Sequence, residues 1–281
     1  MRLPSRARSS RLRLYHPLSF LVPGWTHRRL ILRLARRQIE ARYRGSVLGS
    51  LWTLIQPLLM LSVYSFVFGS VFNSHWKVED GREVQFALAV FAGMVLFTVF
   101  SECVNDAPRL LIQNQIYIKQ VRFPVEILAW VDLLGALFTF SINLTMLLVF
   151  FLVLRGLPPP ALLALPVLLP AVLLLTLGVT WTLSSAGVFL RDLGPIAGVG
   201  TMALMFLSPV FYPFSRIPAE FRPFYAWNPF VTVIEGFRAA LFEGRWPEPR
   251  LLLFVTAASW AVAWLGYAGF MKAKRGFADV L

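Results

Sequence analysis

Charged residues are scarce in this 281-residue chain. Asp, Glu, Lys and Arg together make up 15% of it, whereas 57% of its residues are hydrophobic. Soluble domains usually carry about 25% charged and about 45–50% apolar residues. A soluble fold of this length could not bury so much apolar surface while exposing so few charges, which excludes a soluble enzyme and a disordered chain. An integral membrane protein is the broad class that remains.

Catalytic and cofactor-binding motifs are also missing. Cys103 is the only cysteine, so neither an intrachain disulfide nor a cysteine-rich zinc site can form. The three histidines lack the spacing of metal ligands. The sequence has no GxxxxGK[ST] loop that could hold ATP, and no HExxH, GxSxG or DFG pattern. We therefore predict no catalytic residue, no metal site and no cofactor on this chain.

Positive charge is concentrated at the N-terminus. Residues 1–44 hold 12 of the 27 Lys and Arg residues but one of the 14 acidic residues. No zinc-finger, RNP or helix-turn-helix pattern supports a nucleic-acid-binding arm, so no nucleic-acid partner is expected. No apolar segment with a cleavage site follows Arg13, as a targeting peptide would require. We interpret the segment as cytoplasmic and facing the membrane.

Six apolar stretches approach the ~20 residues that a helix needs to cross a bilayer. We predict an all-α membrane protein with six transmembrane helices, at about 47–72, 84–104, 125–154, 161–189, 195–212 and 251–271. Six spans place both termini on one side, which would carry 19 Lys and Arg residues against 8 on the other. The richer side should be cytoplasmic, so both termini are predicted there.

Two cytoplasmic segments are predicted to form helices. Residues 26–44 place arginines on one side and aliphatic residues on the other, which is typical of an amphipathic helix in the membrane interface. A short helix over about 106–123 is predicted to lie across the cytoplasmic face. Asn105 or Asp106 would cap it, Pro108 would suit its first turn and Pro124 would mark its end. The alternative is a mere connector.

The outer segment before the last span is unusual. Residues 208–250 are too aromatic for a free loop and too rich in proline to span the membrane. We predict a helical hairpin at about 213–246 that re-enters the outer leaflet, with arms at about 218–227 and 229–243. Such a hairpin would keep its backbone polar groups paired while burying the aromatic side chains.

Five motifs then occur in a recognisable order. They are RRQIEARYRGSVLGSLWTLIQPLLMLSVYSFVFGSVF (36–72), KQVRFPVEIL (119–128), VFLRDLGPI (188–196), SPVFYPFSRIP (208–218) and WNPFVTVIEGFRAALFEG (227–244). Over most of residues 26–275 the chain resembles the membrane subunit of type-2 ABC exporters, in the polysaccharide branch that contains O-antigen, teichoic acid and capsule permeases. The first motif looks closest to the O-antigen group.

The resemblance implies a partnership. Two copies of the permease would form a channel and pair with two copies of a cytoplasmic ABC ATPase, which would hold ATP and Mg. ATP hydrolysis would move a polysaccharide on an undecaprenyl-diphosphate carrier across the bacterial inner membrane. The chain would then divide into a tail (1–25), the interface helix (26–44), the transporter domain (45–275) and a second tail (276–281). A lipid or drug permease of the same type, or a channel subunit, stays an alternative.

Channel-lining residues are predicted on the first and fifth spans. On the first span, large and polar side chains recur every four residues and form one broad face, where aromatic rings could stack on sugars. Helix packing or lipid contact would give the same pattern. The predicted channel-lining residues are Trp52, Gln56, Met60, Tyr64, Phe68, Met202, Met205 and Phe206.

The remaining candidates follow from the same resemblance. ATPase coupling is assigned to Arg109, Gln113, Asn114, Tyr117 and Lys119. Contact with the carrier diphosphate, or with ordinary lipid headgroups, is assigned to Arg37, Arg42, Arg44 and Arg122. The outer gate is assigned to Phe211, Tyr212, Trp227, Glu235 and Arg238. At the inner turn, Arg191 and Asp192 would form either a hinge or a local ion pair.

Overall fold

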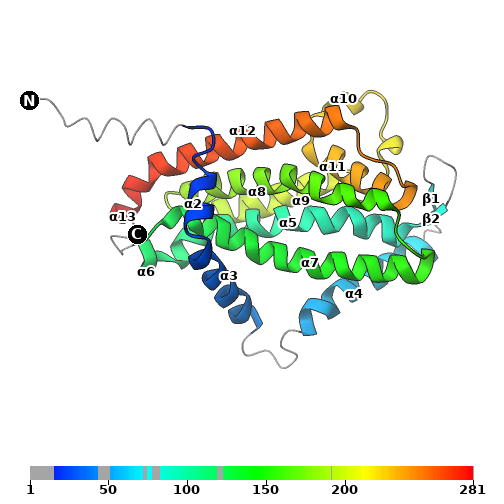
Figure 1. The fold of residues 1–281 in the computed structure, drawn as a ribbon, viewed down its shortest axis with the longest axis horizontal. Helices are drawn as coiled ribbons and strands as arrows, with labels where there is room; N and C mark the ends of the chain where they lie inside the picture. Colours follow the sequence, from blue (N-terminus) through cyan, green and yellow to red (C-terminus); the bar gives the residue numbers. More distant parts are fainter. Residues whose placement is uncertain are drawn as a thin grey trace, which may run out of the picture.

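The computed structural model describes residues 16–43, 51–71, 75–77, 83–118, 123–190 and 192–280, and most of these residues are helical. The long helices run roughly along one axis and form an elongated bundle (Figure 1). One end of the bundle holds α3 (Arg28–Tyr43) and α6 (Gln115–Ile118), and we call it the α3 end. The opposite end holds two short strands, and we call it the β end.

Four helices among the described residues are long and apolar enough to cross a membrane. They match four of the predicted spans: α5 (Phe86–Gln113), α7 (Leu128–Arg155), α8 (Leu165–Gly187) and α12 (Pro249–Ala273). Shorter apolar helices lie at the predicted first and fifth spans. They are α4 (Trp52–Tyr64), which continues as the π-helix η2 (Ser65–Val71), and α9 (Leu193–Phe206). The helical membrane fold is confirmed, and the number of six spans stays a prediction.

Helix α5 lies at the centre of the bundle. Its side chains are buried along most of its length, because α7, α8, α9 and α11 (Pro229–Arg238) pack around it. Burial on several sides explains why its sequence is apolar almost throughout rather than along one stripe. The helices that surround α5 expose more of their apolar surface, as a membrane-embedded bundle requires.

Helices α8 and α12 approach each other closely at two glycines. A Cβ on Gly266 would lie 2.2 Å from the carbonyl oxygen of Gly178, and a Cβ on Gly178 would lie 2.5 Å from that of Val262. No larger side chain fits at either position, so the two backbones pack directly on each other. Small residues permit this kind of close contact between membrane helices.

The prediction that a separate helix begins at Asn105 or Asp106 is wrong. Helix α5 continues without a break through Pro108 to Gln113, and the short α6 follows. Asn105 lies inside α5, and its Oδ1 accepts a hydrogen bond from Thr201 Oγ1 of α9 at 2.9 Å. Proline removes one helical hydrogen bond, but tight packing holds the helix here. A Cβ on Gly187 of α8 would lie 2.2 Å from the Pro108 carbonyl oxygen.

The amphipathic helix predicted at 26–44 is present as α3, after the short α2 (Leu21–Thr26). Part of its apolar face is covered by protein, because Ile31 and Ala35 are buried against Ile127 and Val131. Those partners lie in the turn η3 (Val125–Ile127) and at the start of α7. Helix α3 is therefore attached to the bundle through η3 and α7, and its place in the membrane interface stays a prediction.

The β end contains the antiparallel strands β1 (His75–Lys77) and β2 (Glu83–Gln85) and the predicted outer hairpin. The hairpin has a first arm α10 (Arg222–Ala226) and a second arm formed by α11 and the π-helix η6 (Ala239–Glu243). Asn228 begins the second arm, since its Oδ1 accepts a hydrogen bond from the Phe230 amide at 3.0 Å. The two arms match the predicted positions, and the first is shorter than expected.

Candidate functional site

A cavity of about 560 Å³ opens at the α3 end of the bundle. It lies between α3, the last turns of α5, α6 and the first turns of α7, and we call it the α3 cavity. Three of the predicted coupling residues line it together with one predicted diphosphate or headgroup residue: Gln113, Asn114, Tyr117 and Arg37. The structure thus brings together residues that are up to 80 positions apart in the chain.

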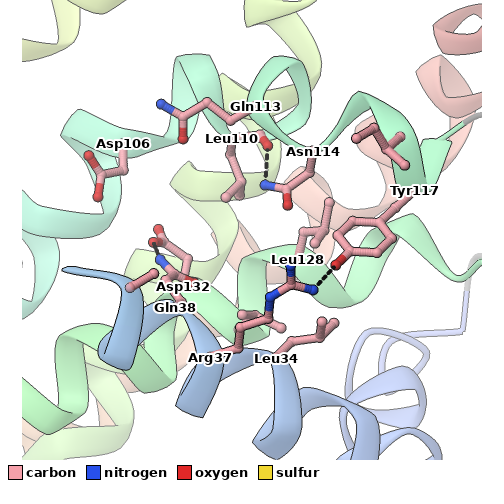
Figure 2. Close-up of a pocket in the computed structure, with 13 residues that line it drawn as sticks. Leu34, Arg37, Gln38, Asp106, Leu110, Gln113, Asn114, Tyr117, Leu128 and Asp132 are labelled. Atoms are coloured by element: carbon pink, nitrogen blue, oxygen red, sulfur yellow. Dashed lines mark hydrogen bonds between the residues drawn. The ribbon is translucent and has the colours of Figure 1, made fainter. Parts of the chain in front are cut away.

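Polar contacts connect α3 to the other walls of the α3 cavity (Figure 2). Arg37 Nη1 donates a hydrogen bond to the Tyr117 hydroxyl at 3.3 Å, and Gln38 Nε2 donates one to Asp132 Oδ1 at 3.3 Å. The Tyr117 ring also stacks on Phe123, with ring centroids 4.8 Å apart. Movement of α3 would therefore alter its contacts with both α6 and the start of α7.

Other predicted residues of this end are placed separately. Arg109 does not line the α3 cavity; its guanidinium lies beside Gly194 at the start of α9. Asp192 precedes α9 and is exposed, and its side chain caps no amide in the described part of that helix. The predictions on Arg44, Lys119, Arg122 and Arg191, and on the side chain of Phe68, lie outside the described residues.

A second cavity, of about 280 Å³, lies beside α4, and we call it the α4 cavity. Its walls come from α4, α5, α7 and the end of α3. Three residues of the predicted channel face line it: Trp52, Gln56 and Met60. This face of α4 thus borders an open cavity against α5 and α7, and all three residues are exposed. Their role in lining a channel stays a prediction.

Charged and hydroxyl groups lie at one end of the α4 cavity. Arg42 Nη1 and Glu102 Oε2 form an ion pair at 3.3 Å, and Thr139 Oγ1 donates to the same carboxylate oxygen at 3.3 Å. Arg42 is a predicted diphosphate or headgroup residue, and its positive charge here is compensated by Glu102. The ion pair fastens the end of α3 to α5.

Aromatic residues from the predicted channel and gate meet near the β end. Tyr64, the last residue of α4, and Phe206 of α9 both pack on Phe211. Their ring centroids lie 6.3 Å and 5.3 Å, respectively, from that of Phe211. The Tyr212 hydroxyl bonds to the Phe206 carbonyl oxygen at 2.5 Å and to the Tyr225 hydroxyl at 3.1 Å. This aromatic cluster joins α4, α9 and the outer hairpin.

The other predicted lining and gate residues lie less centrally. Met202 is exposed and Met205 is partly buried against the core. Trp227 is 78% exposed, with one ring contact to Phe254 of α12.

Arg238, which was assigned to the outer gate, is buried in the structure, and its role in a gate stays a prediction. It is only 4% exposed, and its guanidinium donates to the carbonyl oxygens of Ala89, Pro209 and Val210. Nη1 also forms an ion pair with Glu235 at 3.1 Å. Burial lowers the pKa of Arg238 to about 10, so the side chain is still charged at neutral pH. Arg238 therefore ties the hairpin to α5 and to the turn after α9.

A family model with the description "ABC-2 type transporter" matches residues 29–242. The chain belongs to the ABC-2 type transporter family. The match includes all of α3 but its first residue, both cavities, the aromatic cluster and the Arg238 anchor. Together with the apolar helices, it establishes a multi-pass membrane protein.

Individual relatives of this ABC-2 transporter agree with the family match. The chain is 28% identical to "O-antigen export system permease protein RfbA" of Myxococcus xanthus, over 91% of the chain and 96% of that protein. It is 24% identical to a Klebsiella pneumoniae protein of the same name, over 90% and 95%. It is 22% identical to "Polysialic acid transport protein KpsM" of Escherichia coli, over 83% and 88%. The resemblance to polysaccharide-export permeases is confirmed.

Several cavity residues of the ABC-2 transporter were missed in the sequence. Gln38, Thr139 and Asn143 line the two cavities, yet none was singled out. A signal did exist for the last two, because they are polar, lie four residues apart in an apolar span and so share one helix face. Gln38 gave no comparable signal, since it lies among the charged residues of α3.

Proposed function

We propose that this chain is the membrane-spanning permease subunit of an ATP-driven exporter that moves a lipid-linked polysaccharide, most specifically O-antigen, out of a bacterial cell. The observation that carries the proposal is the near full-length similarity to proteins named O-antigen export permeases. A capsule-type polymer is the second candidate, supported by the weaker similarity to the polysialic acid transport protein.

The proposal includes the arrangement in the membrane. Two copies would form the translocation channel in the inner membrane, with the α3 end and both termini in the cytoplasm and the β end outside. The arginines of α3 support this orientation, because positive charge favours the cytoplasmic side. The carrier would be undecaprenyl diphosphate, and membrane lipids would surround the exposed apolar helices.

The power source would be a separate protein. The chain has no phosphate loop, so two ATPase subunits would hold ATP and Mg and would dock at the α3 end. The end of α5 together with α6 is the proposed coupling segment. Its contacts to α3 support this role, because Arg37 and Tyr117 would transmit a push on α6 to the interface helix.

We expect the purified permease to show no ATP turnover above an empty-detergent control. Co-expression with its ATPase should give a two-plus-two complex that hydrolyses ATP. Light scattering of the purified complex gives the stoichiometry, and phosphate release gives the activity. Steady ATP turnover by the permease alone would overturn the assignment of hydrolysis to a partner.

The cellular test of the proposal is gene deletion with complementation. Loss of the gene should remove long-chain polysaccharide from the cell surface and leave the lipid-linked polymer inside. Staining of surface polysaccharide and extraction of the carrier-linked form measure the two pools. Normal surface polysaccharide in the deletion strain would contradict the proposed function.

A further inference from the structure

The α4 cavity contains a buried hydrogen-bond acceptor without a donor. Asn143 of α7 lines this cavity and is 8% exposed. Its Oδ1 accepts no hydrogen bond from any group in the described ranges of the chain. A buried acceptor that lacks a donor costs free energy, because it has lost its hydrogen bond with water. An occupant that offers a hydrogen-bond donor would recover this free energy.

The polar groups around Asn143 select the chemistry of the occupant. Glu102 adds a carboxylate to the same cavity, and the charge of Arg42 is already compensated by this carboxylate. The hydroxyls of Thr98 and Thr139 donate hydrogen bonds to Met94 O and Glu102 Oε2, respectively. Toward the cavity they can therefore act only as acceptors. The Gln56 and Asn143 amides, the Trp52 indole and the Arg42 guanidinium bring donors to the same walls, so donors and acceptors lie together beside the Glu102 carboxylate. They favour hydroxyl groups over the oxygens of a phosphate, which are acceptors and carry negative charge.

The apolar groups and the size of the α4 cavity narrow the choice of molecule that could occupy it. Trp52 is 43% exposed and lines the cavity, so one part of the wall is an aromatic ring. Aromatic rings pack on apolar CH groups while neighbouring polar groups bond hydroxyls. A volume of about 280 Å³ is at the small end of ligand sites. It suits a single sugar ring better than a length of polymer.

We infer that the α4 cavity binds one sugar unit, with hydroxyls donating to Asn143 Oδ1 and Glu102 and with the ring packed against Trp52. The inference rests on the proposed function and adds to it a glycan contact formed by α4, α5 and α7 of one subunit. The ion pair of Arg42 with Glu102 would then place this contact next to the interface helix.

Protection from a thiol reagent tests the site directly. A cysteine is placed by Gln56→Cys in a Cys103→Ala background, and its reaction with a membrane-permeant maleimide is timed in the purified ATPase complex. The probes are octyl glucoside and octyl phosphate, which share one tail and differ in the head. We expect octyl glucoside to slow the labelling and octyl phosphate not to. Equal protection by both probes would show a site for the tail, and no protection would show no ligand site; either result overturns the inference.

Asn143→Leu removes the acceptor while it keeps a side chain of similar size. We expect the concentration of octyl glucoside that gives half-protection to rise about 5- to 10-fold, as the loss of one hydrogen bond predicts. Trp52→Leu, at a more exposed position, should raise it as well and covers the case in which Asn143→Leu does not fold. Ser141→Ala, on an exposed part of α7 outside the cavity, is the matched control. Unchanged protection in both Asn143→Leu and Trp52→Leu would overturn the inference.

A cellular comparison separates failure of the sugar site from failure of the proposed function. If deletion of the gene leaves surface polysaccharide unchanged, the proposed function is wrong. If deletion removes the polysaccharide and both Asn143→Leu and Trp52→Leu restore it fully, only the sugar site is wrong. We expect both variants to insert and bind the ATPase normally, yet to restore less polysaccharide than Ser141→Ala.

Discussion

Arg238→Met should prevent stable folding of the permease or lower its free energy of unfolding by about 3–5 kcal/mol, the usual cost when one partner of a buried ion pair is removed. The change leaves the carbonyl oxygens of Ala89, Pro209 and Val210 without their donor and leaves Glu235 without its ion pair. The yield of dimeric protein from detergent and its thermal unfolding midpoint measure the effect.

Two controls separate the anchor from charge as such. Arg250→Met removes an exposed arginine at the start of α12 and should leave the unfolding midpoint nearly unchanged. Arg238→Lys keeps the charge, but one ammonium group cannot reproduce the fork that reaches α5 and the turn after α9 together, so an intermediate loss is expected. If Arg238→Met unfolds at the same temperature as Arg250→Met, the anchor contributes nothing to stability.

Tyr117→Ala should weaken binding of the ATPase about 30-fold, which corresponds to the ~2 kcal/mol typical of an aromatic anchor residue. The expectation rests on the proposed docking of the ATPase at the α3 end. The variant should remain inserted and dimeric, because Tyr117 lies on the short α6, outside the central bundle. Titration of the ATPase against the purified permease gives the affinity, and staining of surface polysaccharide reports export.

Tyr117→Phe distinguishes the ring from the hydroxyl. It keeps the stacking on Phe123 and removes only the hydrogen bond with Arg37. Near-normal binding with reduced export would assign the hydroxyl to communication with α3, whereas the ring would be the binding anchor. Unchanged ATPase binding and normal export in Tyr117→Ala would mean that the segment is only a connector.

Hydropathy located the helices well, because a long apolar run is visible in the sequence without knowledge of its partners in the fold. The arms of the outer hairpin were also predictable, since Asn228 followed by Pro229 is a local signal for a helix start. The end of α5 was not predictable from such local signals. Pro108 looks like the first turn of a new helix, whereas the structure shows α5 continuing through it and packing closely on Gly187 of α8.

The partners of a helix face were the harder problem. The four-residue spacing correctly placed Trp52, Gln56 and Met60 on one face of α4, but spacing cannot tell which surface covers that face. The same holds for Ile31 and Ala35, whose apolar face could meet lipid or protein. Arg238 shows the limit most clearly. The sequence does not show that its guanidinium reaches three carbonyl oxygens from two other segments of the chain.

The glycine contact between α8 and α12 makes these two helices a closely packed unit within the subunit. Backbones that touch at Gly178 and Gly266 cannot slide past each other without opening a void, and the contact of Gly187 with Pro108 joins α5 to the same block. Helix α4 has a proline inside it and ends in a π-helix, and α9 exposes many of its side chains. We therefore expect that any widening of a path across the membrane would move α4 and α9 relative to the closely packed α5, α8 and α12.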